Sequence, residues 1–119
     1  MRTLLVDDHP AYLAALAALL GRQPGIEIVG QANSGSEGLK LAAELKPGLV
    51  LVDFTMPDMN GADVTLALKG GPAPPRVVVV SNHDAQEYRD MAFKSGADGY
   101  ALKSELDKEL MPLLRRFVG

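Results

Sequence analysis

Short apolar runs without alternation constrain the fold of this chain more than any other feature. Four of them are Leu4–Val6, Leu49–Val52, Val77–Val80 and Tyr100–Leu102. A strand that lacks a polar side chain at every second residue has both faces covered, as in a parallel sheet between two layers of helices. The runs are therefore predicted to be neighbouring strands of one parallel sheet.

Each of these runs ends on a side chain that can handle a phosphoryl group. Asp7 and Asp8 follow the first run, and the other three are followed by Asp53, Ser81 and Lys103. In an open parallel sheet, the ligand crevice lies outside the carboxyl ends of the strands. Three carboxylates, a hydroxyl and an ammonium are therefore expected to meet in one pocket.

Helical segments alternate with the strands, and an apolar stretch at residues 26–30 supplies a fifth strand. The helices are predicted at residues 10–21, 34–45, 61–69 and 84–95, and from Ser104 or Asp107 onward. Strict alternation implies right-handed crossovers and helices on both faces of the sheet. The predicted fold is a doubly wound α/β domain of five βα units in three layers, spanning residues 1–119.

Local signals set the helix boundaries near the end of the chain. Asp84 with Glu87 is predicted to cap the fourth helix, and Gly96 to end it in the left-handed conformation. Met91 is predicted to lie on the inner face of that helix. Pro112 would cost a hydrogen bond inside a helix, so the last helix is predicted to start late or to kink.

Composition excludes several classes of protein. The chain has 119 residues, 47% of them hydrophobic, which suits one domain with a true core. It has no cysteine, and no apolar run approaches the roughly 20 residues of a membrane span. A net charge of −3 argues against binding nucleic acid through this chain alone. The expected location is the cytoplasm, with no membrane partner.

The predicted pocket needs cations. Asp7, Asp8 and Asp53 would repel one another if they were crowded together, and Lys103 offsets only part of that repulsion. A hard divalent cation such as Mg²⁺ suits the remaining carboxylate oxygens. Metal and ammonium would then neutralise an incoming phosphoryl group, and Asp53 is the best nucleophile because it stands alone on a central strand. Ser81 would donate a hydrogen bond to a phosphoryl oxygen.

Each of these residues also has a simpler interpretation. Asp8 could only cap the helix that begins at Pro10, and Asp53 could only start a turn. Ser81 could be a loop hydroxyl and Lys103 a solvated surface charge. Their joint occurrence at four successive strand ends favours a common site over four independent explanations.

These residues and their flanking segments resemble the receiver domain of two-component response regulators over essentially the whole chain. The matching segments are Leu4–Pro10, Val52–Gly61, Val80–Ser81 and Gly96–Lys103. The Asp-Asp-His-Pro sequence is most similar to the subfamily whose output is a LuxR-type helix-turn-helix. The resemblance implies a flavodoxin-like fold with strand order 2-1-3-4-5. It also implies a signalling switch, not an enzyme, that catalyses only its own phosphorylation and dephosphorylation.

The resemblance assigns roles to the site residues. Asp53 would be the phosphoacceptor, loaded by a sensor histidine kinase. Mg²⁺ would be bound by Asp8, Asp53 and the backbone carbonyl of Thr55, with Asp7 acting through water. The remaining pair, Ser81 and Lys103, would hold the phosphoryl oxygens.

Other positions bear on switching and on phosphorylation rates. By resemblance, Tyr100 would turn inward when Ser81 moves toward the phosphoryl group; the alternative is plain strand packing. Asn82 stands where family members often have a small residue, and it is expected to narrow access for the phosphodonor. Thr55 and His83 lie where the family tunes phosphorylation and hydrolysis, although His83 is also readily explained as a surface-loop histidine.

The first helix carries no charge from Pro10 to Leu20 and has a second apolar stripe that includes Tyr12 and Leu19. A helix that is apolar on two faces often buries both. In the family this helix docks the kinase and sometimes a second receiver, so Tyr12 and Leu19 are predicted to form a partner surface for a kinase or a receiver homodimer. The alternative is an alanine-rich helix with two exposed large side chains.

Several functions remain open from the sequence. The receiver could be followed by a DNA-binding output domain beyond Gly119, which alone would contact DNA, or it could act alone by protein contact or phosphorelay. An aspartate-nucleophile phosphohydrolase needs an acid–base aspartate where this chain has Thr55. A flavodoxin-like nucleotide binder needs a loop rich in glycine and hydroxyl side chains where this chain has Asp7–Pro10.

Overall fold

A computed structural model describes residues 1–119, and five parallel strands form its single sheet. The strands are β1 (Arg2–Val6), β2 (Glu27–Ala32), β3 (Leu49–Asp53), β4 (Arg76–Ser81) and β5 (Gly99–Leu102). Their order across the sheet is β2-β1-β3-β4-β5. The predicted doubly wound topology is confirmed, and β3 with its terminal Asp53 is the central strand.

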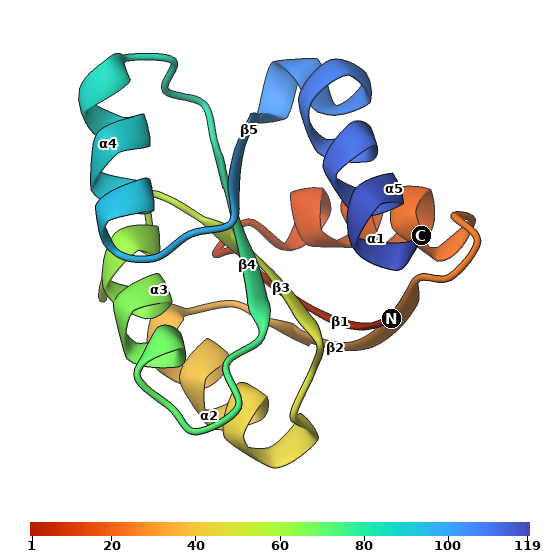
Figure 1. Cartoon of the computed structure of the whole chain (residues 1–119), viewed down its shortest axis with the longest axis horizontal. Helices are drawn as coiled ribbons and strands as arrows, with labels where there is room; N and C mark the ends of the chain where they lie inside the picture. Colours follow the sequence, from red (N-terminus) through yellow and green to blue (C-terminus); the bar gives the residue numbers. More distant parts are fainter.

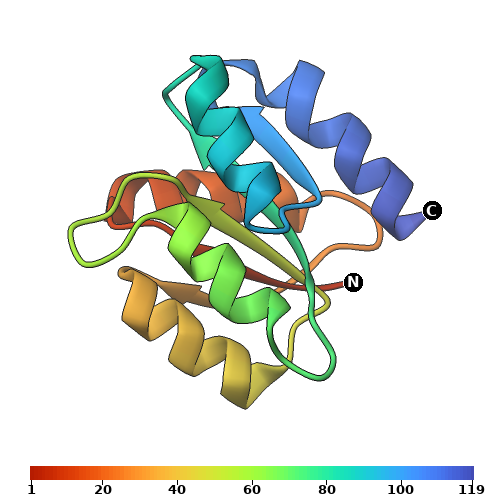
Figure 2. The same cartoon turned by 60° about the vertical axis from the view of Figure 1, so that its left-hand side comes forward.

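Helices cover both faces of this sheet, as Figures 1 and 2 show. They are α1 (Pro10–Gly21), α2 (Gly35–Leu45), α3 (Gly61–Lys69), α4 (Gln86–Lys94) and α5 (Met111–Val118). Two helices, α1 and α5, lie on one face, and the other three lie on the opposite face. None of the helices is both long and apolar enough to cross a lipid bilayer.

The strands supply side chains to both layers in turn, because successive residues of a strand point to opposite faces. In β1, Leu4 and Val6 pack into the core beneath α2, α3 and α4. Leu5, between them, packs into the core beneath α1 and α5. All three are almost completely buried. This double burial explains why the strand sequences show no polar alternation.

The last helix starts late, as the position of Pro112 predicted. A 3-10 turn at Lys103–Glu105 and a wide π-helical turn at Leu106–Leu110 precede it. The α-helix begins at Met111, so that Pro112 falls in its first turn, where a missing N–H costs nothing.

Two predictions about the fourth helix were wrong. The residue in the N-cap position is Ala85, without a side-chain bond, and Asp84 instead accepts a hydrogen bond from Arg89. Met91 is 44% exposed, while its neighbour Ala92 is buried. The helix starts after Asp84, so that residue is not in the capping position. The prediction for Gly96 is confirmed, since its φ is +102°.

Candidate functional site

The strand ends bring the predicted site residues to one edge of the sheet. Asp53 is the last residue of β3 and Ser81 is the last of β4. Asp7 follows β1, and Lys103 follows β5. Because all strands are parallel, their carboxyl ends share this edge, and the chain places the carboxylates, the hydroxyl and the ammonium there together.

Lys103 is the centre of the charge arrangement. Its Nζ lies 2.8 Å from Asp7 Oδ2 and 3.5 Å from Asp53 Oδ1. The three side chains are only 10%, 4% and 5% exposed, respectively. Ion pairs with so little solvent around them are screened far less than surface pairs. The idea that Lys103 is a solvated surface charge is therefore wrong.

The electrostatics leave Asp53 short of positive charge. Burial, and after it the neighbouring carboxylate of Asp7, raise the pKa of Asp53 to about 6 against the opposing effect of Lys103. One ammonium shared between two carboxylates cannot offset their repulsion completely. The site therefore carries an excess of negative charge, which a further cation would balance.

An acidic cluster at this edge has the composition of a metal site. Ligand atoms of Asp7, Asp8, His9 and Asp53 all lie within 4.8 Å of one another. Asp8 Oδ1 is buried without a hydrogen-bond partner, which suits an oxygen that a cation would bind. This group of residues could hold a metal ion.

The simpler interpretation of Asp8 as a helix cap is excluded. The N-cap residue of α1 is His9, and no side chain caps the helix. Sequence reasoning missed His9, whose Nδ1 lies 3.0 Å from Asp7 Oδ1 and 3.2 Å from Asp8 Oδ1. A histidine directly after two aspartates was the available signal, but its ring orientation depends on the turn into α1.

The loop after β3 forms one wall of an open pocket above Asp53. The pocket is also lined by Asp8, His9, Thr55, Asn82 and His83. The exposed side chain of Thr55 lies at this wall, and Asn82 lies at the opposite loop. Asn82 thus lies at the pocket, where the sequence predicts that it narrows access for a phosphodonor.

A glycine fixes the start of α3 against the end of β3. The Gly61 N–H donates to the Phe54 carbonyl at 2.7 Å. A Cβ atom on Gly61 would lie 2.7 Å from the Asp53 carbonyl oxygen, which is backbone and cannot move aside. The close approach holds the backbone that carries Asp53.

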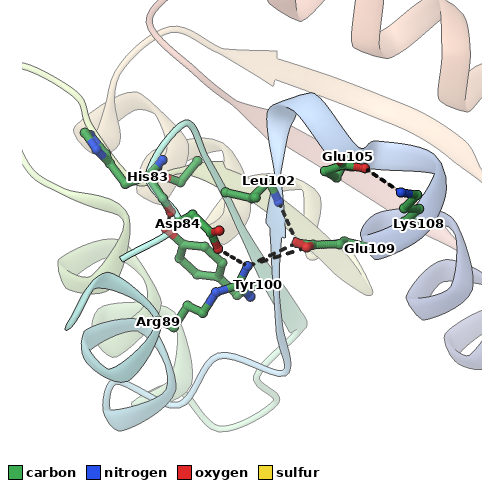
Figure 3. Close-up of polar contacts among 9 residues, drawn as sticks. His83, Asp84, Arg89, Tyr100, Leu102, Glu105, Lys108 and Glu109 are labelled. Atoms are coloured by element: carbon green, nitrogen blue, oxygen red, sulfur yellow. Dashed lines mark hydrogen bonds and ion pairs between the residues drawn. The ribbon is translucent and has the colours of Figure 1, made fainter. Parts of the chain in front are cut away.

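The loop after β4 connects Ser81 to Tyr100. Ser81 is buried and its Oγ accepts a hydrogen bond from the His83 N–H at 3.0 Å. The Tyr100 hydroxyl donates to the His83 carbonyl at 2.7 Å. Figure 3 shows the two residues side by side, and Tyr100 is 5% exposed. Tyr100 therefore lies inward. Its contact with the loop that carries Ser81 is more than plain strand packing.

Charged residues surround the tyrosine in an arrangement that sequence reasoning missed. The Arg89 guanidinium lies over the Tyr100 ring, 4.8 Å from its centroid. It pairs with Asp84 at 3.0 Å and with Glu109 at 3.3 Å, and Glu109 also accepts a hydrogen bond from the Leu102 N–H (Figure 3). These residues are spread over three elements, so no local pattern in the sequence indicated that they meet.

The two predicted partner residues of α1 have different environments. Leu19 is 37% exposed, as expected of an outward stripe. Tyr12 is half-buried, and its ring lies under Lys103 instead of forming an outward surface with Leu19. Its hydroxyl is buried without a hydrogen-bond partner. The outward placement predicted for Tyr12 was wrong because the first turn of α1 directs this side chain toward the site.

Known proteins with similar sequences are response regulators. The chain is 38% identical over 113 residues to the nitrate/nitrite response regulator protein NarL of Escherichia coli K12, covering 95% of this chain and 52% of NarL. It is 35% identical over 115 residues to the transcriptional regulatory protein LiaR of Bacillus subtilis, covering 97% and 54%. The chain thus spans about half the length of the curated relatives it matches.

The fold comparison and the family comparison agree. A LuxR-family two-component response regulator from Aurantimonas sp. SI85-9A1 superposes with a TM-score of 0.91 at 30% identity, covering 98% of this chain and 84% of that structure. The response regulator receiver domain family matches residues 3–115. With the fold, the strand-end residues and these similarities in agreement, the chain belongs to the response regulator receiver domain family.

Proposed function

We propose that this chain is a phosphorylation switch in which Asp53 accepts a phosphoryl group from a sensor histidine kinase. The observation that carries the proposal is the buried Asp53 carboxylate, with Lys103 Nζ at 3.5 Å, at the floor of an open pocket. An isolated surface carboxylate would have neither the buried cation nor the neighbouring hydroxyl of Ser81.

The chemistry is a transfer between two nucleophiles. An Asp53 carboxylate oxygen forms a bond to phosphorus while the P–N bond of the kinase phosphohistidine breaks. The imidazole keeps the electron pair of that bond and takes a proton from solvent. Lys103 and Ser81 hold the phosphoryl oxygens, and this positioning with charge neutralisation is most of what phosphoryl transfer requires.

Mg²⁺ is the cation proposed for the acidic cluster, because it prefers carboxylate and carbonyl oxygens. Asp8, Asp53 and the backbone carbonyl of Thr55 would hold it, with Asp7 acting through water. When bound, it supplies positive charge to the phosphoryl oxygens. The Oδ1 of Asp8, which is buried and accepts no hydrogen bond, supports this assignment.

The switch is proposed to work through the loop after β4. Movement of Ser81 toward a phosphoryl oxygen would break its hydrogen bond with the His83 N–H and shift the carbonyl that Tyr100 binds. Since Tyr100 already lies inward here, a phosphoryl group on Asp53 would act by shifting the balance between packings of Tyr100, and not by first bringing the ring inward. This chain would catalyse only its own phosphorylation and dephosphorylation.

The output is proposed to be transcriptional, through a DNA-binding domain in a longer protein. The similarity to LiaR, a transcriptional regulatory protein about twice as long, supports this. A stand-alone receiver that acts by protein contact or phosphorelay is the alternative.

Intact mass after incubation with acetyl phosphate tests the proposal. The wild type should gain a single phosphoryl adduct that depends on Mg²⁺, and Asp53→Asn should gain none. Asp107→Asn, at an exposed residue that neither lines the pocket nor belongs to the acidic cluster, is the matched control and should behave as wild type. An adduct on Asp53→Asn, or none on the wild type, would contradict the proposal.

A further inference from the structure

Tyr12 lies in the first turn of α1, and its ring faces the ammonium of Lys103. The distance from Lys103 Nζ to the ring centroid is 4.2 Å. A cation within about 6 Å of an aromatic face is attracted to it, and the attraction grows where water is excluded. Lys103 is 10% exposed, so this contact belongs to the stronger kind.

The ring complements the two carboxylates as a partner of Lys103. An ammonium has three N–H donors. Asp7 Oδ2 lies at 2.8 Å, Asp53 Oδ1 at 3.5 Å, and the Tyr12 face accounts for a third contact. Because Asp7 is nearer than Asp53, the carboxylates alone would draw the ammonium toward Asp7, away from the phosphoacceptor.

The contact between the Tyr12 ring and Lys103 does not depend on the state of Asp53. Phosphorylation would convert the Asp53 carboxylate into an acyl phosphate, and a lysine side chain is long and flexible. The Tyr12 ring takes no part in that reaction. Burial, with the charges of Asp7 and Asp53, raises the pKa of Tyr12 to about 12, so the ring stays neutral and keeps its attraction for a cation.

The hydroxyl of Tyr12 contributes nothing visible to this contact. It is buried, and no hydrogen-bond partner lies within reach. Tyr12 also lines a small crevice together with Leu13, Leu16 and Val80. Its aromatic face is therefore the feature that Lys103 uses.

We infer that Tyr12 is a positioning residue, whose aromatic face holds Lys103 where it can reach a phosphoryl group on Asp53. The inference rests on the proposed function and adds a residue to it. It replaces the prediction that Tyr12 belongs to an outward partner surface. An aromatic side chain, with or without a hydroxyl, should satisfy this role, and an aliphatic one should not.

The rate of adduct formation with acetyl phosphate and Mg²⁺ tests the role. Tyr12→Leu should lower the rate constant about tenfold, as expected for a desolvated cation–aromatic contact, whereas Tyr12→Phe should keep it within about twofold. Ala18→Ser, an exposed change on the same helix, is the control and should leave the rate unchanged. Equal rates for Tyr12→Leu and Tyr12→Phe would overturn the inference.

A double-mutant cycle separates positioning from general packing. In a Lys103→Met background, Tyr12→Leu should cause no further loss of rate, because its effect passes through Lys103. An undiminished loss in that background would overturn the inference. Thermal unfolding of each variant identifies any that fail to fold, and Tyr12→Phe keeps the test decisive in that case.

A spectroscopic measurement reads the contact without any phosphodonor. The Hε resonances of Lys103 should be shifted upfield by the ring current of Tyr12, remain shifted in Tyr12→Phe, and return toward ordinary values in Tyr12→Leu. Unshifted resonances in the wild type would overturn the inference. Failure of the wild type to form an adduct, with the ring-current shift present, would instead refute the proposed function.

Discussion

Asp58 is a single carboxylate that joins two elements at the rim of the site. Its oxygens accept hydrogen bonds from the Gly35 N–H at 3.0 Å and from the Ser36 N–H and hydroxyl at 2.9 Å. These donors belong to the first turn of α2, while Asp58 lies in the loop that carries Thr55. These hydrogen bonds lower the pKa of Asp58 to about 2, and the bond from the Ser36 N–H has the largest effect.

Asp58→Asn should therefore lower the free energy of unfolding in a pH-dependent way. A carboxylate whose pKa is lower in the folded protein stabilises it above the ordinary value of 3.8, and that stabilisation is lost as the pH falls toward 2. The difference between wild type and variant should be constant above about pH 5 and shrink between about pH 4 and pH 2. Urea unfolding across this range measures it. A difference that does not change with pH would contradict the assignment.

Residues of the site could be predicted from the sequence where they lie at the end of a strand. Asp53, Ser81 and Lys103 follow from the strands alone, because parallel strands bring their carboxyl ends together. His9 and Tyr12 did not follow, since their positions depend on how α1 turns away from β1. A residue in the first turn of a helix points inward or outward according to the angle of that helix, which apolar stripes alone do not fix.

At the level of elements, the contacts around Tyr100 tie α4 to the end of β5. Arg89 belongs to α4, and Glu109 to the π-helical turn before α5. Glu109 accepts the Leu102 N–H, directly before Lys103 (Figure 3). The Arg89–Glu109 pair thus connects the packing of Tyr100 to the strand that presents Lys103.

Breaking this pair should loosen Tyr100. Arg89→Ala is expected to lower the free energy of unfolding by about 1 kcal/mol, the order expected of a charge-assisted contact that is partly shielded from solvent. The aromatic resonances of Tyr100 should broaden or split, because the ring loses the guanidinium that covers it. Denaturant unfolding and NMR of the Tyr100 ring measure the two effects.

A second ion pair, between the 3-10 turn and the π-helical turn, provides the control. Lys108 and Glu105 lie 3.7 Å apart, and Lys108 is 81% exposed (Figure 3). An exposed pair of this kind contributes little. Lys108→Ala should leave Tyr100 unchanged. Equal effects of the two variants would show that the Arg89 pair has no special connection to the tyrosine.

Element boundaries were less predictable than element order. Pro112 correctly indicated a late start for α5, because a missing N–H is a local property. Asp84 misled, since a cap-forming residue marks a helix start only if the backbone turns there, and here the helix begins two residues later. Asp84 instead pairs with Arg89, which also contacts Glu109, twenty residues away in sequence.

Across the whole molecule, the site lies where both hydrophobic cores end. Tyr100 belongs to the core beneath α2, α3 and α4. Tyr12 packs against the core beneath α1 and α5. Asp53 is therefore connected to both layers of helices. Ser81 and His83 connect it to Tyr100 in one core, and Lys103 connects it to Tyr12 at the other. The overall fold was predictable because strands that are buried on both faces have continuous apolar sequences, which can be recognised without the structure.

Binding of Mg²⁺ at this junction should stabilise the whole fold, since the cluster forms only when the ends of β1 and β3 and the start of α1 are brought together. A ligand that binds only the folded protein adds about 2.7 kcal/mol to the free energy of unfolding at 100 times its dissociation constant. Urea unfolding with EDTA and with increasing Mg²⁺ should show this rise in the wild type. Asp8→Asn should largely remove it, because Asp8 Oδ1 is buried without a hydrogen-bond partner and only His9 Nδ1, at 3.2 Å, faces it.

The matched control is Asp107→Asn, which removes an exposed carboxylate outside the cluster. It lowers the net negative charge by the same amount as Asp8→Asn, so general screening by Mg²⁺ would affect both variants alike. A site at the strand ends predicts that Asp107→Asn keeps the full stabilisation and that Asp8→Asn does not. Equal responses would mean that Mg²⁺ acts on the overall charge of the molecule, and the acidic cluster would then lose its assignment as a metal site.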